Sequence, residues 1–387
     1  MKKILFADSH YFDEYYMLGQ RQYALQFSKN NWDTAFITNP LSIFNIFLGN
    51  NKRRIIDRLH NHFRGGTISK DNLWYYIPFT LIPFHNNTIF DKKWFLDNYY
   101  RFTIPPVTTI LKKSGFSSID ILWIGTPHQK FLKDIIKYKC CVFRLADNTK
   151  EFKKSGNTLL KAQEEMLQSA DIILVTSMVL LDELRNDYPD KEFIYCPNGV
   201  DSSNFLRSQY NIPEEYLRIK NPIALYIGAI EEWFDLQLVS DLAKRCPKVN
   251  FVIIGVDKYE KMKKFSLIKN IFYLGPKQYH DIPNYIYYCD CGIIPFNNSK
   301  LVQSVSPIKM YEFFILGKPV VSKRWKELSL LNSPCYLAND LQDFVGILND
   351  RNIFSIDSTR LINYAQKNTW EDRYLKIITT LQDKGFI

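Results

Sequence analysis

A short segment in the C-terminal third combines the start of a helix with side chains suited to a diphosphate. Residues 304–321 read SVSPIKMYEFFILGKPVV. Pro307 predicts the opening of a helix that ends at Gly317. The N–H groups and partial positive charge at a helix N-terminus suit a diphosphate. Lys309 adds a full charge on the first turn. Glu312 follows one turn later on the same face, within reach of a ribose.

Two serines precede this helix, and a purely structural interpretation of the segment is also open. Ser304 and Ser306 are expected to cap the helix N-terminus. An ordinary capped helix with a Lys–Glu pair one turn apart would explain Lys309 as well as a binding role does. The string as a whole is more specific than either residue alone.

A second set of residues could accept a proton from a hydroxyl group. Asp147 ends an apolar run at 141–146 and is the first candidate. His128, in the loop after 121–125, is second, and Asp13 is third. An N-cap or ion-pair role explains Asp147 equally well. A solvated loop position is the simpler explanation for the other two.

These residues lie in a repeated alternation of short apolar strands and amphipathic helices, which predicts parallel sheets with crossover helices. Gly228, Gly255 and Gly275 each end a predicted strand at the carboxyl edge, where open α/β sheets bind ligands. Strands are expected at 4–7, 34–38, 121–125, 141–146, 172–177 and 193–197, and then at 223–228, 250–255, 271–275, 291–296 and 319–322.

The length of 387 residues exceeds what one core supports, so two domains are expected. Asn198-Gly199 is a turn signal at the boundary. We expect domains at 1–205 and 206–365, with a terminal helix over 366–387 that has Trp370 on one face. Residues 40–105 fit the alternation poorly and are expected to be an irregular insertion.

Composition places the chain among ordinary globular proteins, with 46% hydrophobic and 23% charged residues. The first apolar run stops at Asp8, which favours a strand over a signal peptide. No run reaches the roughly 18 apolar residues of a membrane-spanning helix. The seven cysteines form no CxxC pair, so we expect reduced, buried thiols, no metal site and a cytoplasmic location.

The net charge of +10 indicates anionic partners. Five cations, Lys52, Arg53, Arg54, Arg58 and Arg64, lie among apolar residues. The runs 41–48 and 74–84 are apolar or aromatic. Together they favour an anionic membrane surface over nucleic acid. The alternative is that the aromatic residues fill a domain core.

Several motifs are absent, and each absence excludes a class. There is no GxGxxG and no GxxxxGK[ST], so neither a dinucleotide nor a P-loop site is indicated. No Asp-x-Asp pair occurs, which disfavours metal-dependent sugar transferases with one Rossmann-like domain. The lack of GxSxG argues against a serine hydrolase.

The chain resembles the glycosyltransferase-B (GT-B) superfamily, in which two Rossmann-like domains face a cleft. The string P-x-K-x-Y-E-x(4)-G-K-P-V-V resembles the donor-binding motif of bacterial cell-surface polysaccharide glycosyltransferases. Further similar segments are 170–177, Pro197–Asp201, Tyr226–Gly228 and the terminal helix. The likeness spans most of the chain and is weakest over 40–105.

The resemblance implies a sugar transferred from a nucleotide-diphosphate sugar, with a UDP-sugar favoured, to a saccharide or lipid-linked saccharide in cell-surface polysaccharide synthesis. The first domain would bind the acceptor and the second the donor. No cofactor and no nucleic acid are implied, and the enzyme would work on the inner face of the plasma membrane. The donor-binding residues would be Gly228, Trp233, Lys277, Tyr279, Ser306, Ile308, Lys309, Met310 and Glu312.

One departure bears on mechanism. Many retaining members carry two glutamates eight residues apart, whereas the earlier position is Ser304 here. The pattern is closer to the xanthan-type glucuronosyltransferase, so an inverting, metal-independent reaction is favoured, with Asp147 as the base. A nucleotide-sugar epimerase on the same fold and a non-enzymatic basic membrane- or nucleic-acid-binding protein are the alternatives.

Overall fold

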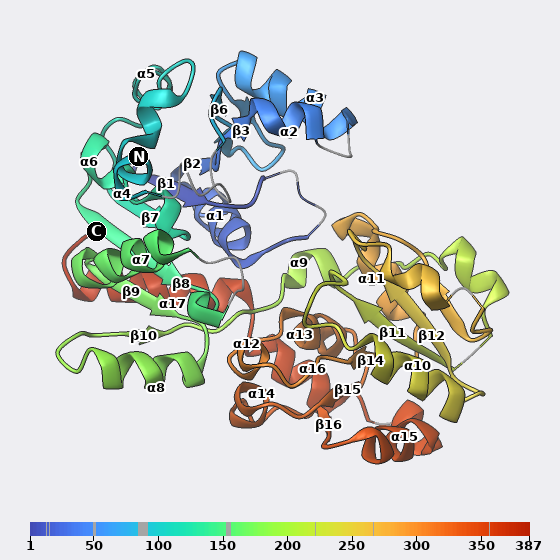
Figure 1. The fold of residues 1–387 in the computed structure, drawn as a ribbon. Helices are drawn as coiled ribbons and strands as arrows, with labels where there is room; N and C mark the ends of the chain where they lie inside the picture. Colours follow the sequence, from blue (N-terminus) through green and yellow to red (C-terminus); the bar gives the residue numbers. More distant parts are fainter. Residues whose placement is uncertain are drawn as a thin grey trace.

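The computed structural model describes residues 1–12, 14, 16–48, 52–83, 92–151, 156–220, 222–265, 267–355 and 357–387. Within these residues the chain forms two α/β domains that lie side by side (Figure 1). Each domain is a mainly parallel sheet with helices on its faces. The predicted fold class, two Rossmann-like domains, is confirmed.

The first domain is built on an eight-stranded sheet of order β10-β9-β8-β7-β1-β2-β5-β4. Its pairs are parallel except that β4 runs antiparallel to β5. Two short strands, β3 (Leu41–Ser42) and β6 (Phe79–Thr80), pair separately. The strands of the main sheet are β1 (Lys3–Asp8), β2 (Asp33–Thr38), β4 (Thr67–Ile68), β5 (Trp74–Tyr76), β7 (Ile121–Ile124), β8 (Cys140–Leu145), β9 (Ile172–Val175) and β10 (Ile194–Tyr195).

The second domain has a six-stranded, wholly parallel sheet of order β13-β12-β11-β14-β15-β16. Crossover connections of this kind bring the carboxyl ends of the strands to one edge. The strands are β11 (Ile223–Ile227), β12 (Asn250–Ile254), β13 (Ile271–Tyr273), β14 (Cys291–Ile294), β15 (Val320–Lys323) and β16 (Tyr336–Ala338).

Helices cover both sheets. In the first domain they are α1 (Gly19–Lys29), α2 (Ile43–Leu48), α3 (Lys52–Phe63), α4 (Lys93–Asn98), α5 (Val107–Lys113), α6 (Leu132–Ile135), α7 (Asn157–Ser169) and α8 (Met178–Asp187). The rest are α9 (Ser202–Phe205), α10 (Leu236–Arg245), α11 (Ile282–Tyr287), α12 (Lys300–Gln303), α13 (Ile308–Ile315), α14 (Lys326–Leu330), α15 (Leu341–Asn349), α16 (Thr359–Gln366) and α17 (Trp370–Asp383).

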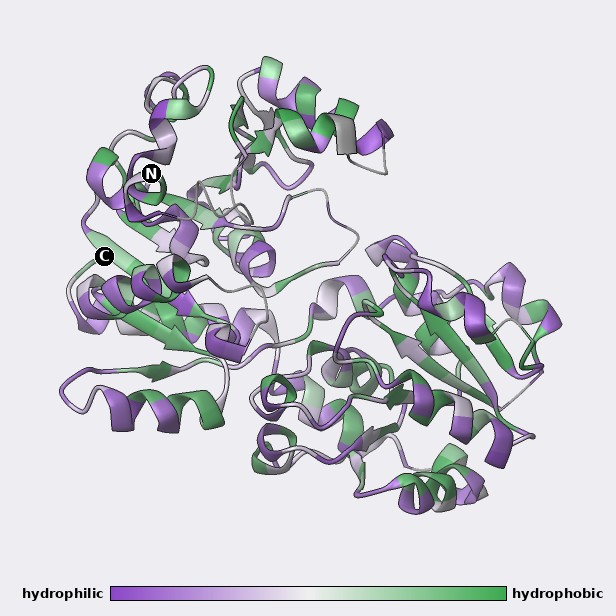
Figure 2. Cartoon of the chain, in the orientation of Figure 1, coloured by the Kyte–Doolittle hydropathy of each residue, from purple (hydrophilic) through white to green (hydrophobic). Residues whose placement is uncertain are grey.

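The strands are apolar on both sides because helices bury both faces of each sheet. On β1, for example, Leu5 and Ala7 belong to the apolar cluster on one face, whereas Ile4 and Phe6 belong to the cluster on the other. Figure 2 shows the central strands as the most hydrophobic elements and the helices as amphipathic. This burial is the main source of stability in both domains.

Residues 40–105 are more regular than the sequence indicated, so the prediction of an irregular insertion was wrong in part. β5 pairs in parallel with β2 and extends the main sheet. Trp74, on β5, stacks on Phe116 with ring centroids 5.7 Å apart. The strand was missed because it is only three residues long and its register depends on aromatic packing from distant residues.

The terminal helix α17 packs against α1 of the first domain. Thr369 and Asp372 form a capping box at its start. Trp370, the first residue of α17, is buried, and its ring lies edge-on to that of Tyr23 with the ring centroids 5.2 Å apart. The boundaries proposed at 205 and 365 stay predictions.

Glu327 on α14 ties the second domain to the first. Its side chain is fully buried and accepts hydrogen bonds from Ser177 Oγ (2.8 Å) and the Val179 N–H (3.0 Å), at the start of α8. Tyr195 O–H is a third donor, at 3.5 Å. A carboxylate at a helix N-terminus is a favourable arrangement, so this contact fixes the two domains together on one side of the cleft.

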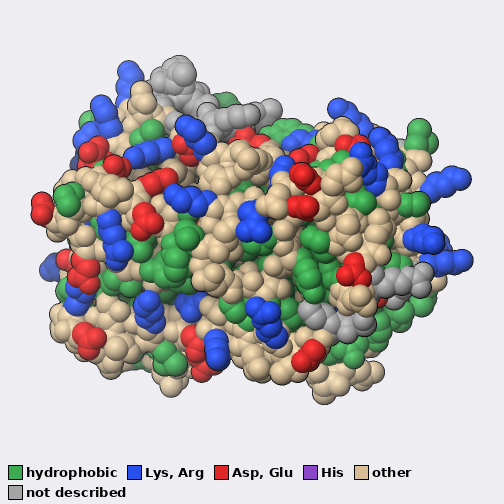
Figure 3. Space-filling model, turned by 90° about the horizontal axis from the view of Figure 1, so that it is seen from below, with side chains coloured by type: hydrophobic (Ala, Val, Ile, Leu, Met, Phe, Trp, Pro, Cys, Tyr) green, Lys and Arg blue, Asp and Glu red, His purple; other side chains and the backbone are tan. Residues whose placement is uncertain are grey.

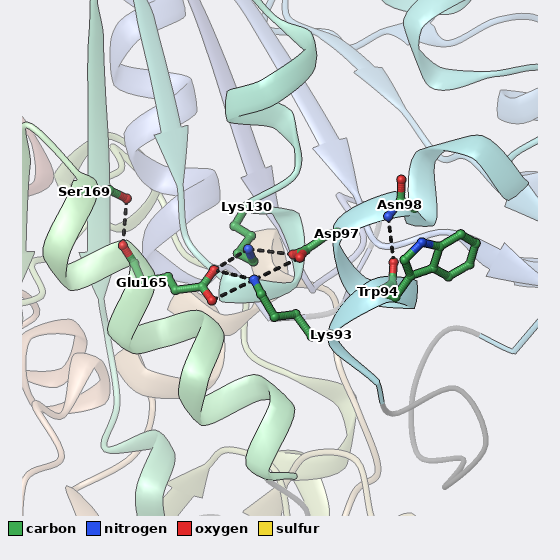
Figure 4. A network of polar contacts seen from close by, with 7 residues as sticks. All are labelled: Lys93, Trp94, Asp97, Asn98, Lys130, Glu165 and Ser169. Atoms are coloured by element: carbon green, nitrogen blue, oxygen red, sulfur yellow. Dashed lines mark hydrogen bonds and ion pairs between the residues drawn. The ribbon is translucent and has the colours of Figure 1, made fainter.

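An ion-pair network secures the outer helices of the first domain (Figure 4). Lys130 pairs with Asp97 at 2.6 Å and with Glu165 at 2.5 Å. Lys93 pairs with the same two carboxylates. These pairs hold α4 against α7 beside the loop that carries His128. The hydrogen bonds from Lys130 and Lys93 lower the pKa of Glu165.

Within the described residues, no helix is long and apolar enough to cross a membrane. Nor does this part of the chain bring together three or more His, Cys, Asp or Glu side chains that could hold a metal ion. On the coloured part of the face in Figure 3, basic and acidic side chains are interspersed, so the positive excess forms no continuous patch there.

Candidate functional site

Helix α13 begins without a side-chain cap. Pro307 occupies the N-cap position and makes no capping hydrogen bond. Ser304 Oγ donates to the Leu301 carbonyl, and Ser306 Oγ accepts from the Asn198 N–H at 3.4 Å. The prediction that the two serines cap this helix was therefore wrong, because both serines bond elsewhere. The first N–H groups of α13 lack a side-chain acceptor, which suits an anionic ligand.

Glu312 lies on this helix with its side chain fully buried. Its Oε2 accepts from Lys309 Nζ at 2.8 Å, the i,i+3 pair of the purely structural interpretation. Its Oε1 is buried and has no hydrogen-bond partner. Buried carboxylate oxygens are normally paired, and an unpaired one indicates a missing partner. A hydroxyl group of a ligand would supply it.

Tyr279 lies next to this pair, at the start of the short helix Tyr279–Asp281. Lys309 Nζ is 6.0 Å from the centroid of its ring. Its hydroxyl accepts from Gln22 Nε2 of α1, in the first domain, at 3.2 Å. Burial raises the pKa of Tyr279 well above its usual value, and the charge of Glu312 adds to this. Tyr279 is thus neutral and bridges the two domains.

A small cavity lies here between the two domains. It brings together three of the predicted donor residues, Lys277, Tyr279 and Lys309. Burial lowers the pKa of Lys277, but the ion pair with Glu215 outweighs it and the net shift is upward. The cavity is lined by Tyr16, Ile227, Ile254, Gly255, Pro276, Lys277, Tyr279, Ile282 and Lys309.

Tyr16 contributes to the cavity from the first domain. Its hydroxyl accepts a hydrogen bond of 2.6 Å from the N–H of Val256, just beyond strand β12. Burial raises the pKa of Tyr16 to about 12. At this strand end a Cβ on Gly255 would lie 1.7 Å from the carbonyl oxygen of Gly228. The close approach of the two backbones therefore requires glycine at 255.

Trp233 follows β11 and packs against apolar clusters on both faces of the second sheet. Asp235 caps α10 by accepting from the Leu238 N–H at 2.9 Å. A helix-start role therefore explains both residues. Met310 is fully buried in the core of the second domain, and Ile308 packs against the first-domain cluster that holds Tyr23. Neither of these last two lines the cavity.

Asp147 lies just past the carboxyl end of β8, with its side chain exposed. Desolvation of the carboxylate by the surrounding protein raises the pKa of Asp147. The charges of Arg144 and His10 oppose this rise, and the charge of Asp8 adds to it. His128 lies elsewhere on this edge, with Nδ1 3.1 Å from Thr126 Oγ1. Asp13 lies outside the described residues.

Sequence reasoning missed a pair at the end of β1. His10 Nδ1 lies 3.6 Å from Oδ2 of Asp8, and Asp8 is buried. Partial desolvation lowers the pKa of His10, but the carboxylate of Asp8 outweighs this, and the charges of Glu14 and Asp147 add to the net rise. The strand-end rule that selected Asp147 was also applied to the end of β1, where it selected Asp13 and not this pair.

Part of the chain matches a known protein family, and the whole chain is similar to known structures. Residues 209–327, in the second domain, match the family described as glycosyl transferases group 1. The chain is also similar to TuaH of Bacillus subtilis (strain 168), provisionally assigned as a teichuronic acid biosynthesis glycosyltransferase, with 23% identity over 258 residues. The alignment covers 62% of this chain and 64% of that relative, somewhat less than two thirds of its length.

Several solved structures share the fold. Sucrose-phosphate synthase from Thermosynechococcus elongatus superposes with a TM-score of 0.72 at 12% identity, covering 99% of each chain. Anabaena HepE, in complex with UDP and glucose, gives 0.68 at 13% identity over 99% of this chain and 100% of that one. WaaG, involved in lipopolysaccharide biosynthesis, gives 0.62 at 13% identity over 97% and 99%. The fold is therefore of the GT-B type.

Proposed function

We propose that the protein is a group 1 glycosyltransferase that moves a sugar from a UDP-sugar to a saccharide or lipid-linked saccharide in the synthesis of a cell-surface polysaccharide. The observation that carries the proposal is the buried, unpaired Oε1 of Glu312, beside Lys309 at the uncapped start of α13. The group 1 match and the likeness to TuaH support glycosyl transfer as the activity.

In this scheme the second domain binds the donor. The unpaired oxygen of Glu312 accepts a hydrogen bond from a ribose hydroxyl. The N–H groups at the start of α13, with Ser306 and Lys309, hold the diphosphate. Tyr279 and Lys277 line the cavity together with Lys309, and in this scheme they contact the base. The preference for a UDP-sugar donor that we propose is supported by the UDP and UDP-glucose complexes of HepE, which has the same fold.

The chemistry that we propose is a direct displacement that inverts the anomeric centre. The acceptor oxygen forms a bond to the anomeric carbon as the bond from that carbon to the β-phosphate oxygen breaks. The hydroxyl proton passes to Asp147, and the nucleoside diphosphate leaves. Lys309 and the start of α13 stabilise the charge that develops on the diphosphate. The scheme calls on no metal ion and no cofactor.

The proposal extends to the transferred sugar and to the acceptor. By likeness to the xanthan-type glucuronosyltransferase, we propose a hexosyl or glycuronosyl unit. The first domain, with Asp147 and the Asp8–His10 pair at the carboxyl edge of its sheet, would bind the acceptor.

The proposed acceptor is reached at an anionic membrane on the cytoplasmic side. Helix α3 supports this by exposing apolar and basic side chains together: Phe63 is 77% exposed and Ile56 51%, and Lys52, Arg53 and Arg64 are exposed near them. Such a surface places apolar groups at the headgroup boundary and cations next to anionic lipid.

The function is tested by release of nucleotide from a panel of UDP- and GDP-sugars, with lipid-linked saccharide extracts as acceptors. We expect acceptor-dependent release of UDP from one donor, and the loss of this release in Glu312→Ala. Conversion of a UDP-sugar without any acceptor would indicate an epimerase instead. No turnover with any donor, in a protein that binds anionic lipid or DNA, would favour a binding protein.

A further inference from the structure

Tyr16 fills part of the cavity that we assign to the donor, and it does so from the opposite domain. Among the described residues that line this cavity, only Tyr16 belongs to the first domain. The space left between the lining residues has room for about one water molecule. Pockets that hold small ligands are typically about 300–1,000 Å³. Part of the lining must therefore move before a nucleotide can enter.

Tyr16 is the lining residue best suited to move. It lies in the connection between β1 and α1, outside any helix or strand, and it is half-buried. Its hydroxyl accepts a hydrogen bond of 2.6 Å from the Val256 N–H, just beyond β12. The side chain can leave the cavity at the cost of this hydrogen bond and of its own packing. The Val256 N–H is then free to donate to an oxygen of a ligand.

Helix α3 holds this part of the connection in place. Glu14 Oε2 accepts from Arg54 Nη1 at 3.1 Å, and Glu14 Oε1 accepts from Arg58 Nη2 at 2.9 Å. The guanidinium carbon of Arg58 also lies 3.7 Å from the centroid of the Tyr11 ring. The two arginine side chains are 18% and 12% exposed, so water screens these ion pairs less than it screens surface pairs. Glu14 is two residues from Tyr16, so α3 restrains the position of the tyrosine.

We propose that Tyr16 is a built-in competitor of the donor nucleotide, kept in the cavity by the contacts of Glu14 with α3. In the ligand-free protein, the tyrosine hydroxyl takes the place of a ligand oxygen on the Val256 N–H. The nucleotide enters as Tyr16 leaves. The measured affinity is therefore the intrinsic affinity reduced by the fraction of molecules in which Tyr16 has left the cavity. The inference rests on the proposed function, in which the base of a UDP-sugar lies in this cavity.

Calorimetric titration of the full chain with UDP tests the competition. Tyr16→Phe keeps the ring and removes the hydrogen bond to Val256, so it should bind UDP about fivefold more tightly than wild type does. Tyr16→Ala also removes the ring and should tighten UDP binding by at least as much. The matched control is Tyr273→Phe, because the Tyr273 hydroxyl donates to the Gly255 carbonyl at 2.9 Å, at the same strand end, but does not line the cavity. This control should bind UDP within about twofold of the wild-type affinity, which is less than the effect of one hydrogen bond.

A double-mutant cycle tests the role of α3. Glu14→Gln removes the charge that pairs with the two arginines, and it should tighten UDP binding by about two- to fivefold in the wild-type background. The same substitution should leave the UDP affinity of Tyr16→Ala unchanged, because no ring is left to be held in the cavity. No gain in the wild-type background, or an equal gain in both backgrounds, would overturn the role of α3.

Hydrogen exchange of the Val256 amide, measured by NMR on the ligand-free protein, tests the contact without any nucleotide. The exchange should be faster in Tyr16→Phe than in wild type or in Tyr273→Phe. Equal exchange in wild type and Tyr16→Phe would overturn the inference, because the tyrosine would then not protect this N–H group.

The outcomes separate this inference from the proposed function. UDP affinity that is unchanged or weaker in both Tyr16 variants would overturn the inference and leave the proposed function standing. UDP binding to none of the proteins would remove the proposed donor, and the inference with it. Thermal melting establishes that each variant is folded. Should Tyr16→Ala fail to fold, Tyr16→Phe takes its place in both tests.

Discussion

The two fully buried glutamates of the second domain, Glu312 and Glu327, should lose different amounts of stability on the same substitution to glutamine. Glu327 accepts three hydrogen bonds from the first domain. In Glu312 only one oxygen is paired, and the other is buried without a partner. A residue whose role is to bind a ligand is expected to destabilise the folded protein when the ligand is absent. A residue with a structural role is expected to stabilise it.

The magnitudes follow from these contacts. The unpaired oxygen of Glu312 costs about 1–3 kcal/mol, and its ion pair with the partly exposed Lys309 returns about 1 kcal/mol. Glu312→Gln should therefore change the free energy of unfolding by about 1 kcal/mol or less, in either direction. Glu327→Gln weakens charge-assisted hydrogen bonds at a helix start and turns an amide nitrogen towards a donor. That change should cost about 2–3 kcal/mol.

Urea unfolding followed by circular dichroism, on the full chain without ligand, measures both changes. At one UDP concentration, the unfolding midpoint of wild type should then rise more than that of Glu312→Gln. A loss in Glu312→Gln as large as the loss in Glu327→Gln would refute the reasoning, since it would make Glu312 a structural residue.

Three further predictions concern catalysis and the membrane. Asp147→Asn should lower kcat about 10²-fold or more and leave the Kd for UDP unchanged in calorimetry; near-normal turnover would remove Asp147 from the mechanism. The base must be ionised, so kcat should fall as the pH drops through the raised pKa of Asp147. The charge of His10 lowers this pKa. His10→Gln removes that charge and should therefore move the acidic limb of the pH–kcat profile to higher pH. An unmoved limb in the pH–kcat profile would separate His10 from Asp147. Ile56→Glu with Phe63→Glu should abolish flotation with anionic vesicles, while the exposed Leu267→Glu in the second domain should not; flotation lost in both or in neither would contradict a membrane role for α3.

Local sequence signals predicted the parts of the molecule that depend on near neighbours. The strand-ending glycines, the helix bounded by Pro307 and Gly317, and the Lys309–Glu312 pair each follow from residues within one or two turns. The two-domain parallel fold followed from the alternation of these elements and from the chain length.

Long-range contacts were outside the reach of the same reasoning. Ser306 was expected to cap its own helix, but it pairs with Asn198 more than a hundred residues earlier in the chain. The contact of Tyr16 with Val256 and the burial of Glu327 between the domains depend on how the domains meet. The Asp8–His10 pair is local, and it was missed because the strand-end rule selected Asp13 at the end of the first strand.

The most direct test of the donor site is a calorimetric titration of wild type and Glu312→Gln with UDP and with GDP. The proposed site predicts that UDP binds wild type more tightly than GDP does, and that Glu312→Gln weakens UDP about tenfold or more, because a charged hydrogen bond to the ribose is lost. Binding of neither nucleotide to wild type, or equal UDP affinity in the two proteins, would contradict it.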